Sequence, residues 1–340
     1  MDSEKILVSI LALSYNHEKY IRKCLDGFVM QQTHFKYEVL IHDDASTDRS
    51  AKIIREYQRR YPDIIFPIIQ SDNQYSKGVR INDTYQYPRA RGKYIAFCEC
   101  DDYWTDSNKL QRQVDFMEQN PDYGLCYTDY TLLDEARGSV IPSCFAKGKP
   151  RSSGFTDHLL SQGYIAPMTW LFRKEERDKF VFSEPFIDGS FALALEFFKH
   201  SKVGFLDVDT ATHVSHLGSA SNQTNPRNRF LYEKNVFKEQ LYYARKYEER
   251  SIVNRICFDK YLNLLPDAMR FGDKEFIEDA DLFFSSRDAC FDDIARFAKR
   301  MNELRSDAFN ARKSKSYQLG NLLIKPFKIL SGLWRKRKFL

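Results

Sequence analysis

Hydrophobic residues in the first third of the chain follow two alternating patterns. Ile6 to Leu13 is a continuous apolar run with β-branched members, which is typical of a strand buried on both faces of a parallel sheet. Residues 18–30 then show helical spacing, and strand and helix continue to alternate. The further elements expected are strands at 37–41, 64–69, 94–98 and 125–130, a helix ending near residue 60, and a helix beyond residue 106.

This alternation predicts right-handed βαβ units and a doubly wound sheet, with ligand sites at the carboxyl ends of the strands. Residues 135–155 are rich in Gly, Ser, Pro and Lys, which predicts an exposed loop. From residue 226 to 309 the pattern is helical almost throughout. The expected organisation is an α/β domain over residues 1–221, a helical subdomain over 222–311 and a basic amphipathic tail over 312–340.

Composition describes a soluble globular protein, because 43% of the 340 residues are apolar and 29% are charged. The seven cysteines include no CxxC pair, so neither a zinc ribbon nor a disulfide framework is indicated, and a reducing cytoplasm fits best. The run at 6–13 lacks the basic flank and cleavage site of a signal peptide. No window approaches the roughly 18 apolar residues that span a bilayer.

The net charge of +5 is unevenly distributed. Residues 312–340 hold nine Lys or Arg and no acid, so residues 1–311 carry 43 basic against 47 acidic residues, a net charge of −4. Apolar residues recur at helical spacing from 319 to 334, which favours a peripheral anchor on an anionic membrane. A helix docked on the protein and a nucleic-acid arm are the alternatives. We expect no nucleic-acid partner, because the remaining chain is acidic and no nucleic-acid motif is present.

Two acidic residues, Asp43 and Asp44, directly follow the apolar strand at 37–41. Helix capping is the simpler interpretation of the residues after them: Ser46 or Thr47 would be the N-cap, and Asp48 would lie in the first turn. Capping does not explain two adjacent acids at a strand end. One of them must point toward the crevice, which favours a role in ligand binding.

A second acidic cluster follows the strand at 94–98 and contains Glu99, Asp101 and Asp102. Three carboxylates within four residues repel one another unless a cation or hydrogen-bond donors neutralise them. Mg²⁺ or Mn²⁺ is the economical answer, since both prefer oxygen ligands and commonly share them with phosphate. A solvated acidic turn is the alternative. The CxC pair formed by Cys98 and Cys100 is a weak signal for a soft metal, and small buried residues are the simpler interpretation.

Several motifs in order along the chain resemble those of the large family 2 of nucleotide-sugar glycosyltransferases, which have the GT-A fold. They are Ile-Leu-Ala-Leu-Ser-Tyr-Asn at 10–16, Ile-His-Asp-Asp-Ala-Ser-Thr-Asp at 41–48, Arg-Gly-Lys-Tyr-Ile-Ala-Phe at 91–97, Asp-Asp at 101–102 and Lys-Leu-Gln at 109–111. The resemblance covers about residues 5–130 and weakens toward 221. It implies a Rossmann-like, mixed, mainly parallel sheet flanked by helices, with a nucleotide-binding half at 1–130 and an acceptor half at 131–221.

The resemblance also implies roles for individual residues. Tyr15 matches the tyrosine that stacks on uracil, and Asp44 matches the acid that reads the base edge, with Asp43 supporting the same loop. Asp101 matches the carboxylate near the ribose. Asp102 matches the ligand of the divalent metal that bridges the diphosphate. Where relatives often have Asp, this sequence has Glu99.

An inverting transfer needs a carboxylate as general base, and the resemblance implies that it lies in the second half of the domain, at the start of a helix. Asp188, in Phe-Ile-Asp-Gly-Ser at 186–190, is the candidate, and Glu184 and Glu196 are the fallbacks. A helix cap is the alternative role for Asp188. His216 matches a histidine that completes the metal shell in some relatives, and His213 is a weaker candidate, because histidines near a strand end are commonly polar loop residues.

Together these observations predict an inverting, metal-dependent transfer of a sugar from a nucleotide sugar, most simply a UDP-hexose. The expected acceptor is a glycan or lipid-linked oligosaccharide of a bacterial cell-surface polysaccharide. The expected location is the cytoplasm, peripheral on the inner face of the membrane. A nucleotidyltransferase and a non-catalytic nucleotide-sugar-binding or membrane-scaffold protein are the alternatives. Against the first, residues 14–17 lack the usual glycine-rich phosphate loop.

Overall fold

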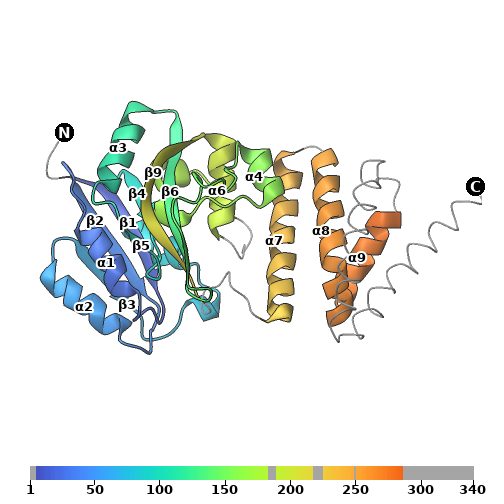
Figure 1. The fold of residues 1–340 in the computed structure, drawn as a ribbon, viewed down its shortest axis with the longest axis horizontal. Coiled ribbons are helices and arrows are strands. Elements are labelled where there is room, and N and C mark those ends of the chain that lie inside the picture. Colours follow the sequence, from blue (N-terminus) through green and yellow to red (C-terminus); the bar gives the residue numbers. More distant parts are fainter. Residues whose placement is uncertain (1–4, 183–188, 217–224, 249, 286–340) are drawn as a thin grey trace, which may run out of the picture. The chain divides into compact units, whose positions relative to one another are not determined.

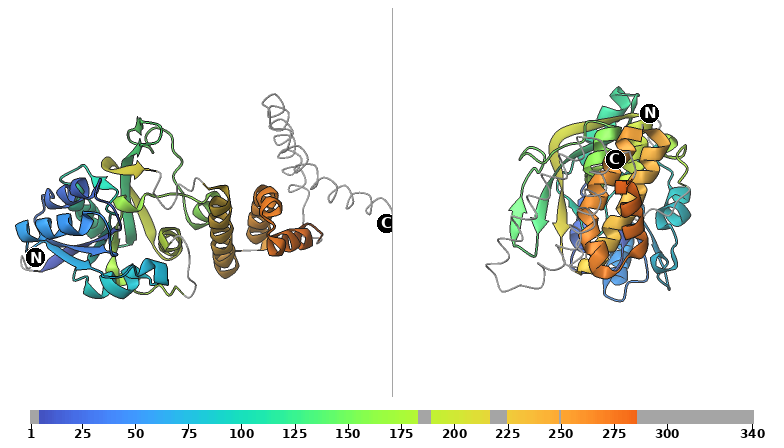
Figure 2. Two further views of the ribbon diagram at one scale, coloured as in Figure 1. Left: turned by 90° about the horizontal axis from the view of Figure 1, so that it is seen from below. Right: turned by 90° about the vertical axis from the view of Figure 1, so that its right-hand side faces the viewer.

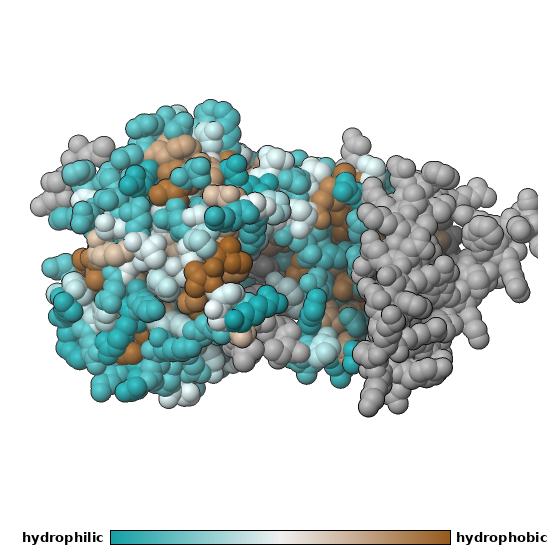
Figure 3. Space-filling view, viewed as in Figure 1, coloured by the Kyte–Doolittle hydropathy of each residue, from teal (hydrophilic) through white to brown (hydrophobic). Residues whose placement is uncertain are grey.

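A computed structural model describes residues 5–182, 189–216, 225–248 and 250–285. The chain divides into two compact units, Met1–Asn222 and Gln223–Leu340. The first unit contains a nine-stranded mixed sheet with helices on both sides, and the described part of the second unit is helical. On the face seen in Figure 3, hydrophilic side chains cover most of the described surface, and hydrophobic ones form separate patches.

Four parallel strands form the first half of the sheet in the order β3-β2-β1-β4. β1, β2 and β4 are mostly buried, and each contains a run of apolar residues, as expected for strands covered on both faces. In β3 only Ile65 is fully buried. The connections β1-α1-β2 and β2-α2-β3 advance in the same direction along the sheet, so right-handed crossovers place α1 and α2 on one face (Figure 1). These elements are β1 (Ile6–Ser14), α1 (Ile21–Val29), β2 (Lys36–Asp43), α2 (Ser50–Arg60), β3 (Ile65–Ile69) and β4 (Tyr94–Phe97).

The chain returns from β3 to β4 through three short helical turns. They lie on the face opposite α1 and α2, as the left-hand view of Figure 2 shows. Gln86 fixes the return segment to the sheet, because its Nε2 donates a hydrogen bond of 2.9 Å to the carbonyl of Ala12 in β1. The turns are η1 (Tyr75–Lys77), η2 (Asn82–Gln86) and η3 (Tyr87–Arg89).

The second half of the sheet continues from β4 in the order β8-β6-β9-β5, and β7 pairs with β6. β8 is antiparallel to both β4 and β6, whereas β6 and β9 are parallel. The sheet is therefore mixed, as the resemblance implied. The elements are β5 (Tyr103–Trp104), α3 (Lys109–Gln119), β6 (Tyr123–Asp134), β7 (Ser139–Ile141), α4 (Phe155–Ser161), η4 (Pro167–Thr169), β8 (Leu171–Arg173), α5 (Lys174–Arg177), α6 (Gly189–His200) and β9 (Lys202–Ser215).

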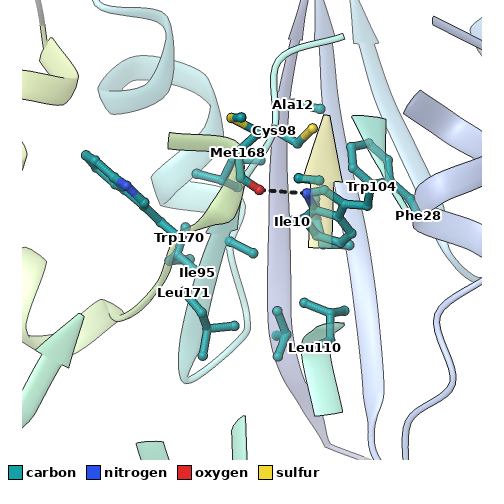
Figure 4. Packing of buried hydrophobic residues seen from close by; sticks show 14 of the residues in the cluster. Ile10, Ala12, Phe28, Ile95, Cys98, Trp104, Leu110, Met168, Trp170 and Leu171 are labelled. Carbon is teal, nitrogen blue, oxygen red and sulfur yellow. Dashed lines mark hydrogen bonds between the residues drawn. The ribbon is translucent and has the colours of Figure 1, made fainter. Parts of the chain in front are cut away.

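Side chains from β5 and α3 join the two halves of this unit at the turn η4. The indole Nε1 of Trp104 donates to the carbonyl of Met168 at 2.8 Å, and the amide of Gln113 donates to the carbonyl of Thr169 at 2.7 Å. Figure 4 shows Trp104 edge-on to Phe28 of α1, with ring centroids 5.0 Å apart. The strand that follows the acidic cluster is therefore held by hydrogen bonds and by core packing.

The expectation of an exposed loop at 135–155 is wrong in part. The segment contains β7, and Cys144 and Phe145 are buried. The buried Asp129 of β6 and the partly buried Asp209 of β9 accept hydrogen bonds from its backbone, a contact that local composition does not reveal. The expectation that Ser46 or Thr47 caps the next helix is also wrong, because α2 begins at Ser50, whose backbone N–H donates to Asp48.

The described part of the second unit consists of α7 (Pro226–Tyr247), α8 (Arg250–Phe271) and α9 (Lys274–Ser285). Asn225 caps α7, because its side chain accepts hydrogen bonds from the backbone of residues 227 and 228. Aromatic rings pack the three helices together, with Phe237 and Phe276 both within 5.2 Å of Tyr261 between ring centroids. The rest of the predicted helical subdomain, 286–311, and the segment 312–340 lie outside the described residues. None of the helices described is long and apolar enough to span a bilayer.

Candidate active site

The candidate residues gather where β1, β2 and β4 end. These strands are parallel neighbours, so their carboxyl ends meet at one edge of the sheet. Ser14, the last residue of β1, lies opposite Asp43, the last residue of β2. The backbone N–H of Cys100 donates to Leu13 at 2.9 Å, which brings the second acidic cluster to the same edge.

The loops after β1 and β2 are joined by side chains. Asp43 accepts hydrogen bonds from the backbone N–H and the hydroxyl of Ser46, at 3.1 and 2.6 Å. The Ser46 hydroxyl in turn accepts from the N–H of Asn16, and the Asn16 side chain accepts from the N–H of Thr47. Asn16 has a φ of 57°, a left-handed conformation that asparagine tolerates. The loops therefore hold Tyr15 at the strand edge with 47% of its side chain exposed.

Asp44 is buried and holds the turn that leads into η1. Its two carboxylate oxygens accept from the backbone N–H groups of Gln74 and Tyr75, at 2.7 and 3.0 Å. The imidazole of His42 lies 3.7 Å from Asp44 Oδ1. In this structure the Asp44 carboxylate therefore joins β2 to the return segment, and a role in reading a base remains a prediction.

Two histidines at the end of β9 contact the acidic pair after β4. His213 Nδ1 lies 3.0 Å from Asp102 Oδ1, which also accepts from the N–H of Val214 at 2.8 Å. His216 Nε2 lies 3.2 Å from Asp101 Oδ2. The structure thus brings all four predicted residues together, but it pairs Asp102 with His213, whereas the sequence pointed to His216 as the residue that shares a metal with Asp102.

A third histidine, His17, lies beside the same acids, with its Nε2 4.0 Å from Asp101 Oδ2. Burial lowers the pKa of His17, but a hydrogen bond with Cys100 and the negative charge of Asp101 outweigh this effect and raise the pKa to about 9. For Asp101, burial acts to raise the pKa, yet the hydrogen bond from His216 and the charge of His17 lower it overall. The imidazole of His17 therefore balances carboxylate charge at the strand edge.

His213 is held in the same way. Burial lowers its pKa, but the hydrogen bond and the negative charge of Asp102 are the stronger influence, and the pKa of His213 is raised overall. A carboxylate bonded to one ring nitrogen fixes the orientation of the imidazole and raises its basicity.

Residues outside the predicted set support His216. The ring of Tyr20 stacks on His216, with 4.9 Å between the ring centroids, and its hydroxyl donates to Glu135 at 2.7 Å. Lys19 also donates to Glu135. Sequence reasoning missed His17, Tyr20 and Glu135. His17 and Tyr20 follow the end of β1, and that position could have identified them as site candidates. Glu135 could not be found in this way, because its contact with Tyr20 joins positions 115 residues apart.

The remaining candidates are the possible general bases and Glu99. Asp188 and Glu184 lie outside the described residues. Glu196 is buried in α6, with His200 Nε2 3.3 Å from its carboxylate. Glu99 is exposed, and its backbone carbonyl accepts from the thiols of Cys24 and Cys98.

The acidic pair can hold a divalent cation that takes its other ligands elsewhere. Oδ1 of Asp101 is buried and accepts no hydrogen bond from the described residues, so it has a free position for a cation. Across the described part of the chain, no three His, Cys, Asp or Glu side chains are grouped as a metal site. A cation here would therefore share its shell with phosphate oxygens and water, which suits Mg²⁺ or Mn²⁺.

Comparison with known families places this site within a recognised domain. Residues 9–195 match the model of glycosyl transferase family 2. An uncharacterized Mycobacterium tuberculosis protein is 39% identical over 170 residues, which is 49% of this chain and 47% of that protein. TuaG of Bacillus subtilis, named as a teichuronic acid biosynthesis glycosyltransferase, is 32% identical over 39% of this chain and 50% of its own length. The chain thus spans about half the length of the curated relatives it matches.

Solved structures show the same fold. S. aureus TarS, in complex with UDP-GlcNAc, superposes with a TM-score of 0.53 at 16% identity and covers 75% of this chain and 81% of its own. The mannosyltransferase PcManGT of Pyrobaculum calidifontis, in complex with GDP-Man and Mn²⁺, has a TM-score of 0.53 at 14% identity over 96% of this chain and 88% of its own. These likenesses confirm the predicted GT-A fold.

Proposed function

The chain belongs to glycosyl transferase family 2, and from this premise we propose that it transfers a sugar from a nucleotide sugar to a glycan with inversion at the anomeric carbon. One observation carries the proposal. Two adjacent carboxylates, three imidazoles and an exposed tyrosine meet at the carboxyl edge of the parallel strands, the place where such sheets bind nucleotides.

The donor is proposed to lie along this edge. Tyr15 stacks on the base, Asp43 and Asp44 hold and read it through the loop after β2, and Asp101 lies near the ribose. A UDP-hexose is the proposed donor. The TarS complex with UDP-GlcNAc supports this choice. Because PcManGT was solved with GDP-Man, a GDP-sugar should also be tested as donor.

A divalent metal, Mn²⁺ or Mg²⁺, is proposed at the acidic pair, with Asp102 and His216 as its protein ligands. The Mn²⁺ in the PcManGT complex and the free oxygen of Asp101 support this cofactor. When bound, the metal stabilises the negative charge of the departing diphosphate. Asp102 keeps its orientation through His213 and Val214, while Tyr20 keeps that of His216.

Asp188 is the proposed general base, which takes the proton of the acceptor hydroxyl as that oxygen attacks the anomeric carbon. Glu196 remains the described fallback, although its described partner is His200 in the same helix. The acceptor is proposed to be a glycan or lipid-linked oligosaccharide of a cell-surface polysaccharide, and the name of TuaG supports this class. The proposed location is the cytoplasmic face of the membrane, reached through the basic tail (residues 312–340).

The test compares Asp102→Asn with the wild-type protein in the presence of Mn²⁺. UDP-glucose, UDP-GlcNAc and GDP-mannose are offered, and slow donor hydrolysis is followed by release of UDP or GDP. We expect wild-type protein to hydrolyse one donor and Asp102→Asn to lose at least about a hundredfold of that rate, the size of effect that follows removal of one charge-stabilising group. Asp63→Asn, at an exposed carboxylate after α2, is the matched control and should keep the rate.

The alternatives predict other results. Binding of a nucleotide sugar without turnover would favour a non-catalytic binding or scaffold protein. Equal hydrolysis by wild-type protein and Asp102→Asn would contradict the assignment of the acidic pair. The base is tested separately, because Asp188→Asn should abolish transfer and leave nucleotide binding nearly unchanged.

A further inference from the structure

A basic loop lies between β7 and α4, beside the candidate site. Residues 136–156 contain four Lys or Arg and no acid, in a body whose net charge is −4. One of the four, Arg137, pairs with Asp134. The other three are Lys147, Lys149 and Arg151, and we call residues 147–151 the basic loop. None of these three side chains has a carboxylate partner within the described residues.

Two acids of the sheet fix the backbone of this segment. Asp129 in β6 accepts from the N–H groups of Phe145 and Ala146, at 2.9 and 3.0 Å. Asp209 in β9 accepts from the N–H of Ser143 at 3.0 Å. The segment leading into the basic loop is therefore firmly placed, and the acids nearest to it are satisfied by backbone N–H groups, so they do not pair with its lysines.

Lys149 is the cation of this loop that faces the site. Its ammonium donates a hydrogen bond to the hydroxyl of Tyr130 and lies 4.6 Å from the ring centroid of Tyr164. Both tyrosine rings lie beside His213, at centroid distances of 6.4 and 6.1 Å. Since His213 bonds Asp102, Lys149 is separated from the acidic pair by one layer of aromatic side chains.

No carboxylate among the described residues pairs with the ammonium of Lys149. The side chain is half-buried, and a partly desolvated ammonium is costly unless it is compensated. The two tyrosine rings compensate part of this cost through cation–π contacts. A carboxylate or phosphate would supply a compensating negative charge. Beside the ammonium, Tyr164 is 36% exposed and offers an aromatic surface to a sugar, whereas Tyr130 is fully buried.

We propose that Lys149 binds the carboxylate or phosphate of an acidic sugar, at the wall formed by Tyr164 and His213, with the buried Tyr130 holding the ammonium in place. The proposal rests on the proposed glycosyl transfer and adds a substrate class to it: one sugar of the reaction, either in the acceptor or in the donor, carries a negative charge. Lys149 thus selects a charged substrate, while the acidic pair deals with the diphosphate.

The test measures sugar binding to full-length protein that is saturated with UDP and Mn²⁺. The probes are glucuronate, glucose 6-phosphate and neutral glucose, followed by ligand-observed NMR. We expect the charged probes to bind wild-type protein at least about tenfold more tightly than glucose, and Lys149→Met to lose that preference. Lys149→Arg should keep it, and Lys147→Met, in the same loop but exposed, is the matched control and should change it less than about twofold.

A second arm separates the sources of the charge. UDP-glucuronate and UDP-glucose are compared for affinity in the same variants without free sugar. A loss at Lys149→Met confined to UDP-glucuronate assigns the charged group to the donor, whereas a loss confined to the free charged sugars assigns it to the acceptor. Either result supports the proposal.

Two outcomes would overturn it. If Lys149→Met binds every probe as wild-type protein does, Lys149 recognises no charged sugar. If Lys149→Met weakens binding of UDP itself as strongly as binding of the charged probes, Lys149 serves the diphosphate instead. Failure of the wild-type protein to bind UDP would reject the proposed function, yet the comparison of charged and neutral sugars without UDP would still test Lys149.

Discussion

At the scale of single residues, Lys109 shows how folding changes side-chain chemistry. It is fully buried at the start of α3, where its ammonium bonds the side chain of Gln113 and lies 4.4 Å from the ring centroid of Trp104. Burial lowers the pKa of Lys109 to about 7. The folded protein therefore binds this proton only below about pH 7, whereas the unfolded chain binds it up to about pH 10.4.

This difference predicts a pH-dependent stability. Between these two pH values the unfolded state holds more protons, so the contribution of Lys109 makes the free energy of unfolding rise with pH, by at most about 1.4 kcal/mol per pH unit. Lys109→Met removes that contribution. We expect urea unfolding at pH 7, 8 and 9 to show the variant gaining stability relative to wild-type protein as the pH falls. Lys52→Met, at an exposed position of α2, should show no such trend, and a parallel pH profile for Lys109→Met would contradict the prediction.

The position of a residue in the fold could be predicted from sequence where that residue ends or follows a strand. Tyr15, Asp43, Asp101 and Asp102 all lie at the expected edge, because parallel strands bring their carboxyl ends together. The partner of Asp102 could not be predicted in this way. Which of two histidines three positions apart reaches it depends on the register of the antiparallel pair β5 and β9, in which Tyr103 lies opposite Thr212, and a two-residue strand gives no sign of that register in local spacing.

At the scale of elements, the apolar runs predicted β1 to β4 within a few residues, because strands buried on both faces need continuous apolar sequence. The short strands β5 and β7 were not predicted, and β8 lies in a region, 168–214, for which strands and helices were expected without individual bounds. Each of these strands has two or three residues. β5 pairs with β9, and β8 with β4 and β6, all far away along the chain, whereas β7 forms a hairpin with β6. Local periodicity carries no signal over so few positions.

The contact between α1 and β5 gives a testable element-level prediction. A Cβ atom at Gly27 of α1 would lie 2.9 Å from the backbone oxygen of Trp104 and 3.0 Å from its nitrogen, so the strand would have to move. Alanine favours a helix by about 1 kcal/mol over glycine, but overpacking of this kind costs about 1–3 kcal/mol. We expect Gly27→Ala to lower the free energy of unfolding in urea, and to weaken nucleotide binding because β5 directly follows the acidic pair.

Gly154→Ala is the control for this experiment, since a Cβ atom there would meet nothing within 4 Å. It should change the free energy of unfolding by less than about 0.5 kcal/mol. If Gly27→Ala proves as stable as wild-type protein, the close approach of helix and strand is not a constraint on the fold.

At the scale of the whole molecule, charge and fold separate along the chain. The buried core cluster that surrounds the sheet lies entirely within the first unit, which also contains the whole described site. Net charge divides differently: residues 1–311 carry −4 and residues 312–340 carry +9. The sequence alone predicts this division, because charge is a sum over positions, whereas the function of the basic tail depends on a partner.

The last prediction concerns that tail. If residues 312–340 hold the protein on an anionic membrane, each Lys or Arg near the surface contributes about 1 kcal/mol, and added salt screens this attraction. We expect the full chain to float with vesicles of phosphatidylcholine and phosphatidylglycerol at 0.1 M salt, and to be released at about 0.5 M. Vesicles of phosphatidylcholine alone should bind much less.

A chain ending at residue 311 should stay unbound with its nucleotide affinity intact, and replacing residues 335–338 by glutamine should give an intermediate result. If both chains float equally well, the body of the protein binds the membrane and the tail is not the anchor. If neither chain floats, the protein does not bind these membranes.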